Sequence, residues 1–479
     1  MDLGNVSRTV ELRPPIVVVL GHVDHGKTTL LDFIRKTNIA SSEAGGITQS
    51  IGASVITTKK GKRITFIDTP GHAAFTSLRV RGTRIADIAV LVVAANDGVK
   101  PQTKEALEYI LSAKIPFIVA ATKIDLPSVS IEKVRSDLEK EKIFFEGKGG
   151  DVPLLAVSGK TGQGVEELLE MILLISELYE IKGDRGGSLD ALVFETGKDK
   201  SGVYVNVIVR NGSLKRGEKV LAGGMWAKIR GLFDWNGHPI NEVLPGEPAR
   251  ILGFPNLPEV GSKITKTAEK YSQETTKESI KKIKYKDKTP ILIKAKNTGA
   301  LEALISNLPE EVYVADKGVG DLTESDVFMA KSTNSKVYLF ESKIPSQVAK
   351  LAQTEGVKVK TFNIIYKLLE EIIEDVGKGQ VTIKGKADIL KIFPFGESKV
   401  AGCRVMQGTM SVGDNISLLR SSKELGQAKI ISMKKEKQDI TSAKQGEECG
   451  IVFMPQVEFG IGDVILSVID SNSKEKIKS

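Results

Sequence analysis

The sequence contains little cysteine and no long apolar run. Cys403 and Cys449 are the only cysteines among 479 residues, too few for a disulfide framework, which favours a reducing, cytoplasmic setting. No run of 18 or more apolar residues occurs, so we expect neither a membrane-spanning helix nor a membrane partner. The N-terminus has no basic region followed by an apolar run, so we expect no secretory signal.

Length and charge point to several domains and an anionic partner. At roughly 100–200 residues per domain, 479 residues should form several domains. Lysine and arginine number 68 against 60 acidic residues, a formal net charge of +8 that favours a partner such as RNA. The basic residues are spread along the chain, so an ordinary solvated surface also accounts for the excess.

The first part of the chain, residues 1–182, alternates short apolar runs with helical patterns. This alternation is typical of a parallel sheet with crossover helices. The candidate buried strands are short apolar runs bounded by turn or polar residues, and they lie at residues 16–20, 64–67, 90–94, 117–121 and 154–157. A helix over residues 164–179 is expected to close this unit, and residues 182–187 are expected to form a linker or turn.

The remaining chain changes pattern several times. Five further segments are expected in order, namely a β-barrel, an α/β domain with a lysine-rich lead-in, a connecting helix, a C-terminal β-barrel and a disordered tail, at residues 183–270, 271–362, 363–378, 379–470 and 471–479. Asn211-Gly212 and Asn236-Gly237 predict hairpins in the first barrel. In the connecting segment, apolar residues recur at helical spacing and form one stripe.

The two predicted barrels share a sequence repeat. Three stretches of the first barrel match three of the second in the same order, namely residues 212–218 with 408–414, 227–229 with 428–430, and 246–251 with 446–451. Three matches in one order make chance an unlikely cause. The sequence therefore predicts a multidomain protein of α/β plus β class that contains two related β-barrels.

A glycine-rich segment lies between the first apolar strand and a helical pattern. It fits the G-x-x-x-x-G-K-[ST] pattern of a phosphate-binding loop, and the residues expected around the nucleotide are Gly21, His22, Val23, Asp24, His25, Gly26, Lys27, Thr28 and Thr29. Glycine lets backbone N–H groups turn toward phosphate, and a helix N-terminus favours anions. Lys27 should reach the β- and γ-phosphates, and the Thr28 hydroxyl should bind Mg²⁺. A fortuitous glycine-rich turn is the alternative.

Two further elements complete the predicted phosphate site. Asp68 follows the strand at residues 64–67, where its carboxylate can hold Mg²⁺ through water, and Gly71 can offer its N–H to the γ-phosphate. Thr48 lies on a glycine-containing segment between these motifs. Its hydroxyl can complete the Mg²⁺ shell when the γ-phosphate is present, which predicts a segment that orders and disorders with the nucleotide.

A third set of residues indicates guanine as the base. These residues follow two later strands and are Thr122, Lys123, Asp125, Ser158, Gly159 and Lys160. The Asp125 carboxylate can accept hydrogen bonds from N1 and N2 of guanine, whereas adenine lacks this donor pair and would leave the carboxylate unpaired. The segment that begins at Ser158 can supply a backbone N–H to the guanine carbonyl. The chain is therefore expected to bind GTP and GDP with Mg²⁺.

These motifs resemble those of translational GTPases. His22-Val23-Asp24-His25 and Asp68-Thr69-Pro70-Gly71-His72 are typical of that family. Further stretches are similar to bacterial-type translation initiation factor 2, namely residues 43–49, 79–82, 318–320, 323–327 and 401–403. The resemblance extends from about Arg13 to Val468. The long N-terminal extension of these factors is expected to be absent, since the chain starts almost at the GTP-binding domain.

The resemblance implies a role in the start of translation. Such factors promote binding of formyl-methionyl initiator tRNA to the small ribosomal subunit, and then joining of the large subunit, which triggers GTP hydrolysis. The resemblance thus implies a GTPase whose partners are both ribosomal subunits and initiator tRNA, and we expect a monomer. It also implies that His72 positions the attacking water and that Val23 and Ile47 form an apolar gate. A structural loop histidine and local packing are the respective alternatives.

In the C-terminal barrel, the resemblance implies a tRNA site. The positions that match the family's site for the formyl-methionyl end are Cys403, Lys434, Lys435, Lys437, Glu448, Cys449 and Gly450. Lysines can neutralise tRNA phosphates, and a small cleft with cysteine and glycine can admit a methionine side chain. A basic surface turn beside two buried cysteines is the alternative.

The sequence departs from the family pattern at three positions. Lys435 stands where arginine is usual and Glu436 where an aromatic residue is usual, so a bidentate donor and a stacking surface are lost. Thr122 replaces the usual asparagine of the base motif, although its hydroxyl can still form a local hydrogen bond.

Two other functions stay open on the sequence. The chain could be another translational GTPase, such as an elongation or selenocysteine-specific factor, although the repeated barrel and the connecting helix argue against a simple elongation factor. It could also be an RNA-binding adaptor for which GTP is a structural ligand.

Overall fold

The computed structural model describes most of the chain, namely residues 10–37, 48–127, 129–266, 288–377, 381–395, 398–420, 423–435, 438–455 and 457–470. The chain divides into two compact units, residues 1–369 and 370–479. Most of the lysine-rich lead-in and the whole tail at residues 471–479 lie outside the described residues. Within the described ranges, no helix is both long and apolar enough to cross a membrane.

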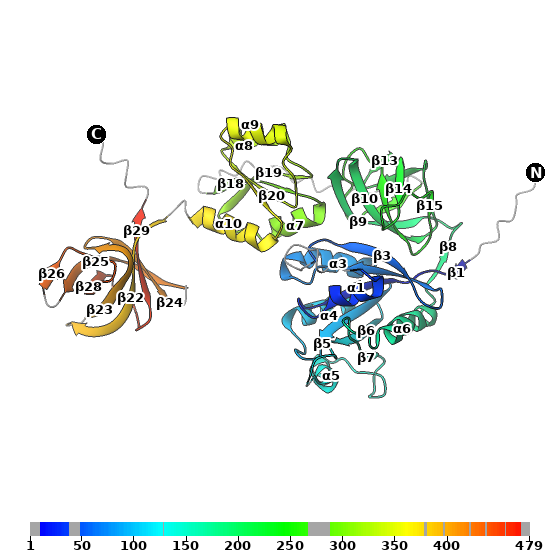
Figure 1. The fold of residues 1–479 in the computed structure, drawn as a ribbon, viewed down its shortest axis with the longest axis horizontal. Coiled ribbons are helices and arrows are strands. Elements are labelled where there is room, and N and C mark those ends of the chain that lie inside the picture. The colour runs from blue at the N-terminus through cyan, green and yellow to red at the C-terminus, as the bar shows by residue number, and fades with distance from the viewer. Residues whose placement is uncertain are drawn as a thin grey trace, which may run out of the picture. The chain divides into compact units, whose positions relative to one another are not determined.

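A six-stranded sheet forms the first domain (Figure 1). Its order is β3-β4-β2-β5-β6-β7, with β3 antiparallel to β4 and every other neighbouring pair parallel. The strands are β2 (Ile16–Gly21), β3 (Gly52–Thr57), β4 (Arg63–Asp68), β5 (Ile88–Ala94), β6 (Phe117–Thr122) and β7 (Leu154–Ala156). The five predicted strands are therefore present, and β3 is an edge strand that the apolar pattern does not reveal.

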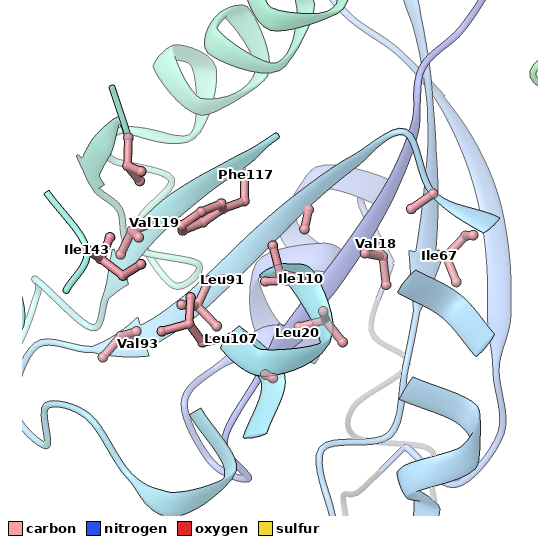
Figure 2. Close-up of a cluster of buried hydrophobic side chains, with 14 of the residues drawn as sticks. Val18, Leu20, Ile67, Leu91, Val93, Leu107, Ile110, Phe117, Val119 and Ile143 are labelled. Atoms are coloured by element: carbon pink, nitrogen blue, oxygen red, sulfur yellow. The ribbon is translucent and has the colours of Figure 1, made fainter. Parts of the chain in front are cut away.

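Both faces of this sheet are buried, which explains why its central strands are apolar throughout. Ile16, Val18 and Leu20 of β2 pack into one cluster, and the residues between them pack into another on the opposite face. Figure 2 shows the first cluster, in which Leu107 and Ile110 pack beside the side chains of β2 and β5. The carboxyl ends of these rigid strands carry the candidate site.

Helices fill the connections between the parallel strands. They are α1 (Lys27–Arg35), the short 3-10 turn η2 (Ala73–Phe75), α3 (Thr76–Ile85), α4 (Pro101–Ala113), α5 (Ile131–Lys140) and α6 (Val165–Leu178). Helix α6 confirms the predicted closing helix. The predicted linker at residues 182–187 is only partly a turn, because β8 (Lys182–Asp184) pairs antiparallel with β1 (Val10–Leu12). Glycine fits this strand because a Cβ on Gly183 would lie 2.7 Å from Pro245 Cβ.

A small β-barrel follows, as the short strands predict. Its strands are β9 (Asp190–Asp199), β10 (Gly202–Asn211), β11 (Leu214–Lys215), β12 (Lys219–Ala222), β13 (Met225–Lys228), β14 (Gly231–Phe233), β15 (Glu242–Val243), β16 (Pro248–Leu252) and β17 (Lys263–Thr265). The main sheet has the order β13-β12-β17-β9-β10-β16-β14. Only Ile229 and Arg230 separate β13 from β14, so the chain itself joins the two edges of this sheet.

The two Asn-Gly pairs of this barrel behave differently. Asn236-Gly237 forms the predicted tight turn, since Gly237 has a φ of 85° and the flanking residues form an antiparallel bridge. Asn211-Gly212 does not close a hairpin, because the next strand, β11, pairs with β15 instead of β10. The Asn211 side chain accepts a hydrogen bond from the Asp184 N–H at 2.8 Å, which ties β8 to the barrel.

An α/β domain follows the first barrel within the first unit. Its elements are β18 (Thr289–Ala295), α7 (Thr298–Ser306), β19 (Val312–Val319), α8 (Glu324–Thr333), β20 (Lys336–Phe340), α9 (Ser346–Thr354) and β21 (Val359–Phe362), and the parallel sheet has the order β19-β18-β20-β21. The predicted connecting helix is α10 (Ile365–Gly377). Ile365, Leu368 and Ile372 are its fully buried residues, whereas Ile373 of the predicted stripe is 57% exposed.

The second unit contains a closed β-barrel. Its strands are β22 (Val381–Phe395), β23 (Ser398–Ser411), β24 (Asn415–Arg420), β25 (Lys423–Lys435), β26 (Gln438–Ile440), β27 (Ser442–Lys444), β28 (Glu448–Met454) and β29 (Val464–Asp470). The ring β22-β29-β24-β25-β28-β23 closes where β23 pairs with β22.

The two barrels have similar structures even in individual turns. The Gly217 N–H donates to the Ile229 carbonyl at 2.8 Å, and the Gly413 N–H donates to the Ile430 carbonyl at the same distance. Both glycines have a φ of 92°. The strand orders also correspond, except that β25 pairs with both β24 and β28 where the first barrel divides this strand into β13 and β14. The predicted relation between the two barrels is confirmed.

Glu195 on β9 is buried where the first barrel contacts α3 and α7. Its Oε1 accepts hydrogen bonds from the N–H groups of Thr196 at 2.9 Å and Gly299 at 3.2 Å, while Oε2 has no partner within the described residues. A Cβ on Gly299 would lie 2.6 Å from Leu78 Cδ2, so this junction is tightly packed. Burial raises the pKa of Glu195 to about 7.

We expect Glu195→Gln to change the pH dependence of stability. Because the pKa of Glu195 is higher in the folded chain, its stabilising contribution is lost as the pH rises from 4.5 to about 7. A neutral amide removes this loss, so the variant should be more stable than wild type at pH 8 by up to about 3 kcal/mol. At pH 4.5 the two proteins should be similar. Thermal unfolding at both pH values measures the difference.

The control for this prediction is Glu259→Gln at an exposed glutamate, which should leave both unfolding temperatures unchanged. An equal shift for Glu195→Gln at both pH values would contradict the protonation mechanism.

Candidate functional site

The loop between β2 and α1 turns tightly. Gly21 and Gly26 have φ values of 147° and 86°, and Asp24 between them has 61°. A Cβ on Gly21 would lie 2.3 Å from the carbonyl oxygen of Val92 on β5, so only glycine fits there. The loop therefore presents the N-terminus of α1 as an anion-binding end.

Lys27, the first residue of α1, lies buried within this loop. Its Nζ donates hydrogen bonds to the carbonyl oxygens of Gly21 at 3.0 Å and His22 at 2.6 Å. Burial lowers the pKa of Lys27 to about 8, and the Asp68 carboxylate partly opposes this. A buried ammonium whose hydrogen-bond partners are neutral carbonyls would be stabilised further by phosphate oxygens.

Thr28, Thr48 and Asp68 offer the oxygen atoms that Mg²⁺ prefers. The hydroxyls of Thr28 and Thr48 lie 3.0 Å apart. Asp68 ends β4; its Oδ1 has no partner in the described part of the chain, and its Oδ2 lies 3.6 Å from Arg35 Nη1. Burial raises the pKa of Asp68, and Arg35 and Lys27 oppose this. An unpaired buried carboxylate oxygen and a pair of hydroxyls fit a hard divalent cation.

A cavity of about 200 Å³ collects the predicted phosphate residues. Its lining comes from the loop, from Thr48, from the segment after β4 and from the base motif, and consists of Val23, Asp24, Gly26, Lys27, Thr28, Thr29, Thr48, Gly71, His72 and Lys123. A Cβ on Gly71 would lie 2.3 Å from Lys27 Nζ, so the Gly71 backbone approaches the lysine closely. Val23 of the predicted apolar gate lines the cavity, whereas Ile47 lies outside the described residues.

His72 lies at the wall of this cavity. Burial lowers the pKa of His72, with smaller contributions from Arg79 and His22, so the imidazole is neutral at pH 7. Its ring contacts the Tyr366 ring in a tilted arrangement, with centroids 4.1 Å apart and planes inclined by 51°. Its Nδ1 accepts only a long contact of 3.5 Å from the Ala74 N–H.

Arg79 on α3 holds the backbone that carries His72. The buried guanidinium donates to the His72 carbonyl oxygen, to Thr76 Oγ1 at 2.9 Å and to Glu105 Oε1 at 2.9 Å. The sequence marks Arg79 only as part of a motif shared with a family and assigns it no role. The feature that could have indicated a role for Arg79 is its place among the buried residues of the short helix α3.

The predicted base-recognition residues gather at the carboxyl ends of β6 and β7. The Ser158 hydroxyl donates to Asp125 Oδ1 at 2.7 Å and accepts the Lys160 N–H at 3.2 Å. The hydrogen bond from Ser158 lowers the pKa of Asp125, which keeps this carboxylate ionised. A Cβ on Gly159 would lie 2.8 Å from the Leu30 nitrogen, so this loop packs directly on α1.

Thr122 links the base motif to the phosphate loop. Its hydroxyl donates to the His25 carbonyl oxygen at 2.6 Å, so the threonine retains a local hydrogen bond. The His25 ring is fully buried, and burial lowers the pKa of His25 to about 4, so this residue offers backbone rather than side chain to a nucleotide. Lys123 adopts a φ of 61° and lines the cavity.

In the second unit, the predicted tRNA-binding residues that the structure describes lie on three neighbouring strands, β23, β25 and β28. Cys403 pairs with Cys449 across β23 and β28, and Lys434 pairs with Gly450 across β25 and β28. Lys437 lies outside the described residues.

The two cysteines do not form the expected cleft. Cys403 is 1% exposed and Cys449 is 6% exposed, and both belong to the barrel core. Burial raises the pKa of the Cys449 thiol to about 11 and raises that of Cys403 as well. Their thiols face the interior because inward and outward side chains alternate along a strand.

The charged members of this group lie on the barrel surface. Lys434 pairs with Asp439 at 3.4 Å, and Lys435 pairs with Glu447 at 2.8 Å. Glu448 forms an exposed ion pair with Arg404. Exposed ion pairs of this kind contribute little to stability, so the lysines can exchange their carboxylate partners for phosphate groups.

Three family models match successive parts of the chain. Residues 13–177 match the Elongation factor Tu GTP binding domain, residues 188–267 match Elongation factor G domain 2, and residues 263–373 match Translation-initiation factor 2. These ranges contain the phosphate loop, the first barrel and the α/β domain that follows it.

Whole-chain relatives decide the family. A translation initiation factor IF-2 from Thermotoga petrophila is 40% identical over 97% of this chain and 72% of its own length. The chain belongs to the translation initiation factor IF-2 family. The IF-2 of Persephonella marina is 40% identical over 95% of this chain, and that of Bartonella quintana is 38% identical over 97%. The chain spans 55% and 59% of the length of these two IF-2 proteins.

Among solved structures, GDP-bound aIF5B from Aeropyrum pernix is 28% identical, covers 95% of this chain and 92% of that chain, and has a TM-score of 0.45. Membership in the IF-2 family confirms the resemblance that residues 43–49 and 79–82 indicate.

Proposed function

We propose that this chain is a translation initiation factor that binds GTP and hydrolyses it on the ribosome. One cavity that collects the phosphate loop, Thr48, Gly71 and His72, in a chain of the IF-2 family, supports this proposal most directly. Asp125, which Ser158 orients, selects guanine. GTP and GDP are therefore the proposed ligands.

The residues of the cavity bind the nucleotide as follows. Lys27 exchanges its carbonyl partners for oxygens of the β- and γ-phosphates, and the Gly71 N–H faces the γ-phosphate. The Thr28 and Thr48 hydroxyls would hold Mg²⁺ directly, and Asp68 would hold it through water. When bound, Mg²⁺ neutralises negative charge on the phosphate oxygens.

His72 orients the attacking water. A neutral imidazole can accept a hydrogen bond from water and align it with the γ-phosphorus. The contact with the Tyr366 ring restrains the imidazole, so the imidazole must be released before it can act. This requirement, together with the proposed gate of Val23 and Ile47, fits slow intrinsic hydrolysis and activation by the ribosome.

The proposed partners are both ribosomal subunits and formyl-methionyl initiator tRNA, with the chain acting as a cytoplasmic monomer. The second barrel is the proposed tRNA site, where Lys434, Lys435 and Lys437 would neutralise tRNA phosphates. Glu448 and Gly450 lie on β28, the strand paired with β25, which carries Lys434 and Lys435, and Cys403 and Cys449 support the strands from the core.

Ribosome-dependent GTP hydrolysis, with initiator tRNA present or absent, tests this function. We expect ribosomes to raise the rate by at least about 10³-fold, as activators in trans do for other GTPases. A rate that ribosomes leave unchanged would favour the RNA-binding adaptor. In filter binding, equal affinity for formyl-methionyl and elongator tRNAs would favour another translational GTPase.

A further inference from the structure

The first turn of α10 is bound by the residue next to Thr48. Gln49 is 5% exposed, and its Nε2 donates to the Asn363 carbonyl oxygen at 2.7 Å. Its Oε1 accepts the N–H of Ile365, the first residue of α10, at 3.1 Å. One amide thus satisfies both a helix-terminal N–H and the Asn363 carbonyl just before the helix. Thr48 contacts Thr28 in the phosphate site. The neighbouring residues Thr48 and Gln49 therefore contact the phosphate site and α10, respectively.

Tyr366, the second residue of α10, contacts His72 of the same site. The Tyr366 and His72 rings lie in close, tilted contact, with centroids 4.1 Å apart and planes inclined by 51°. The Tyr366 hydroxyl is buried and has no hydrogen-bond partner among the described residues. A buried hydroxyl without a partner disfavours the state that contains it. The free-energy cost of burying the unpaired Tyr366 hydroxyl therefore opposes the ring contact, which makes this contact easier to release.

We propose that Tyr366 and Gln49 are positioning residues that form a catch on the GTPase site, with α10 as its base. The Tyr366 ring restrains the imidazole of His72, and Gln49 fixes the segment that carries Thr48 to the same helix turn. While both contacts are made, His72 is not free to orient water. Movement of this one turn releases both elements together. This inference rests on the proposed GTPase function and concerns its regulation.

Because Tyr366 carries both a ring and an unpaired hydroxyl, two substitutions should change the rate of GTP hydrolysis without ribosomes in opposite directions. Tyr366→Ala removes the ring and should free His72, so GTP hydrolysis without ribosomes should rise about three- to tenfold. Tyr366→Phe keeps the ring but removes the unpaired hydroxyl, so the catch should hold at least as well. Its rate without ribosomes should lie at or below that of wild type. A purely structural role for Tyr366 predicts no such difference in sign.

The experiment measures single-turnover hydrolysis of bound GTP by the full-length chain, with and without ribosomes. Gln49→Ala provides a second route to release and should also raise the rate without ribosomes. Lys367→Ala, at an exposed position on the same turn, is the matched control and should leave it unchanged. Affinity for GDP, measured in parallel, shows that each variant retains a folded nucleotide site.

The outcomes separate the catch from the proposed function. If Tyr366→Ala and Gln49→Ala hydrolyse GTP without ribosomes no faster than wild type, or if Tyr366→Phe is accelerated as much as Tyr366→Ala, the catch is wrong. If ribosomes fail to stimulate the wild-type chain, the proposed function itself is wrong.

Discussion

Replacing His72 with alanine should lower ribosome-stimulated GTP hydrolysis by about 10²–10⁴-fold, the usual contribution of a positioned proton acceptor. His72 lines the phosphate cavity, and burial lowers its pKa, so its ring is present there as a neutral acceptor. His25 cannot replace it, because that ring is fully buried beneath the loop. Single-turnover hydrolysis on ribosomes measures the loss, while affinity for GDP should change little.

The matched control is His238→Ala. His238 is the one histidine outside the phosphate motifs, and its side chain is 76% exposed beside Asp234 on the first barrel. This substitution should leave the stimulated rate unchanged. A His72→Ala chain that retained the wild-type rate would show that another group orients the water.

The nucleotide domain could be predicted closely from sequence for a physical reason. Strands β2, β5 and β6 are buried on both faces, so their sequences are continuously apolar and easy to recognise. The site residues follow at the carboxyl ends of these strands, where parallel strands bring them to one edge. Local spacing therefore carries most of the information about this part of the site.

Contacts between distant segments could not be predicted in this way. Gln49 binds backbone atoms of Asn363 and Ile365, more than 300 residues away. No periodicity or motif spacing connects these positions, because the contact exists only after the α/β domain has packed against the first. The same holds for the contact between the His72 and Tyr366 rings. The residues of the proposed catch are therefore visible only in the folded chain.

The candidate tRNA site shows a different limit. Family resemblance groups Cys403 with charged neighbours, but strand alternation separates them, with Arg404 outward and Cys403 in the core. The same alternation places Glu448 outward and Cys449 inward. Because side chains alternate with a period of two along each strand, both cysteines lie in the barrel interior and the charged residues face outward.

Replacing Asp125 with asparagine should lower affinity for GTP by on the order of 10³–10⁴-fold and raise affinity for xanthosine triphosphate. The Asp125 carboxylate is ionised and offers acceptors only, which match the N1–H and amino donors of guanine. An asparagine amide offers one acceptor and one donor, so the guanine amino group would face an N–H group. Xanthine has a carbonyl at that position, and its edge therefore matches the amide.

Equilibrium binding of the two nucleotides measures both changes, and Ser158→Ala is the informative comparison. Ser158 donates to Asp125 at 2.7 Å, so its loss leaves both carboxylate acceptors in place but less well oriented. The Ser158 variant should lose about tenfold in GTP affinity and still prefer guanine to xanthine, because one hydrogen bond to a charged group is removed and no donor is added. An Asp125→Asn chain that also preferred guanine would place base selection on other atoms. The carboxylate would then have a structural role beside Ser158, since only a group that reads the base can reverse the preference when its donors and acceptors change.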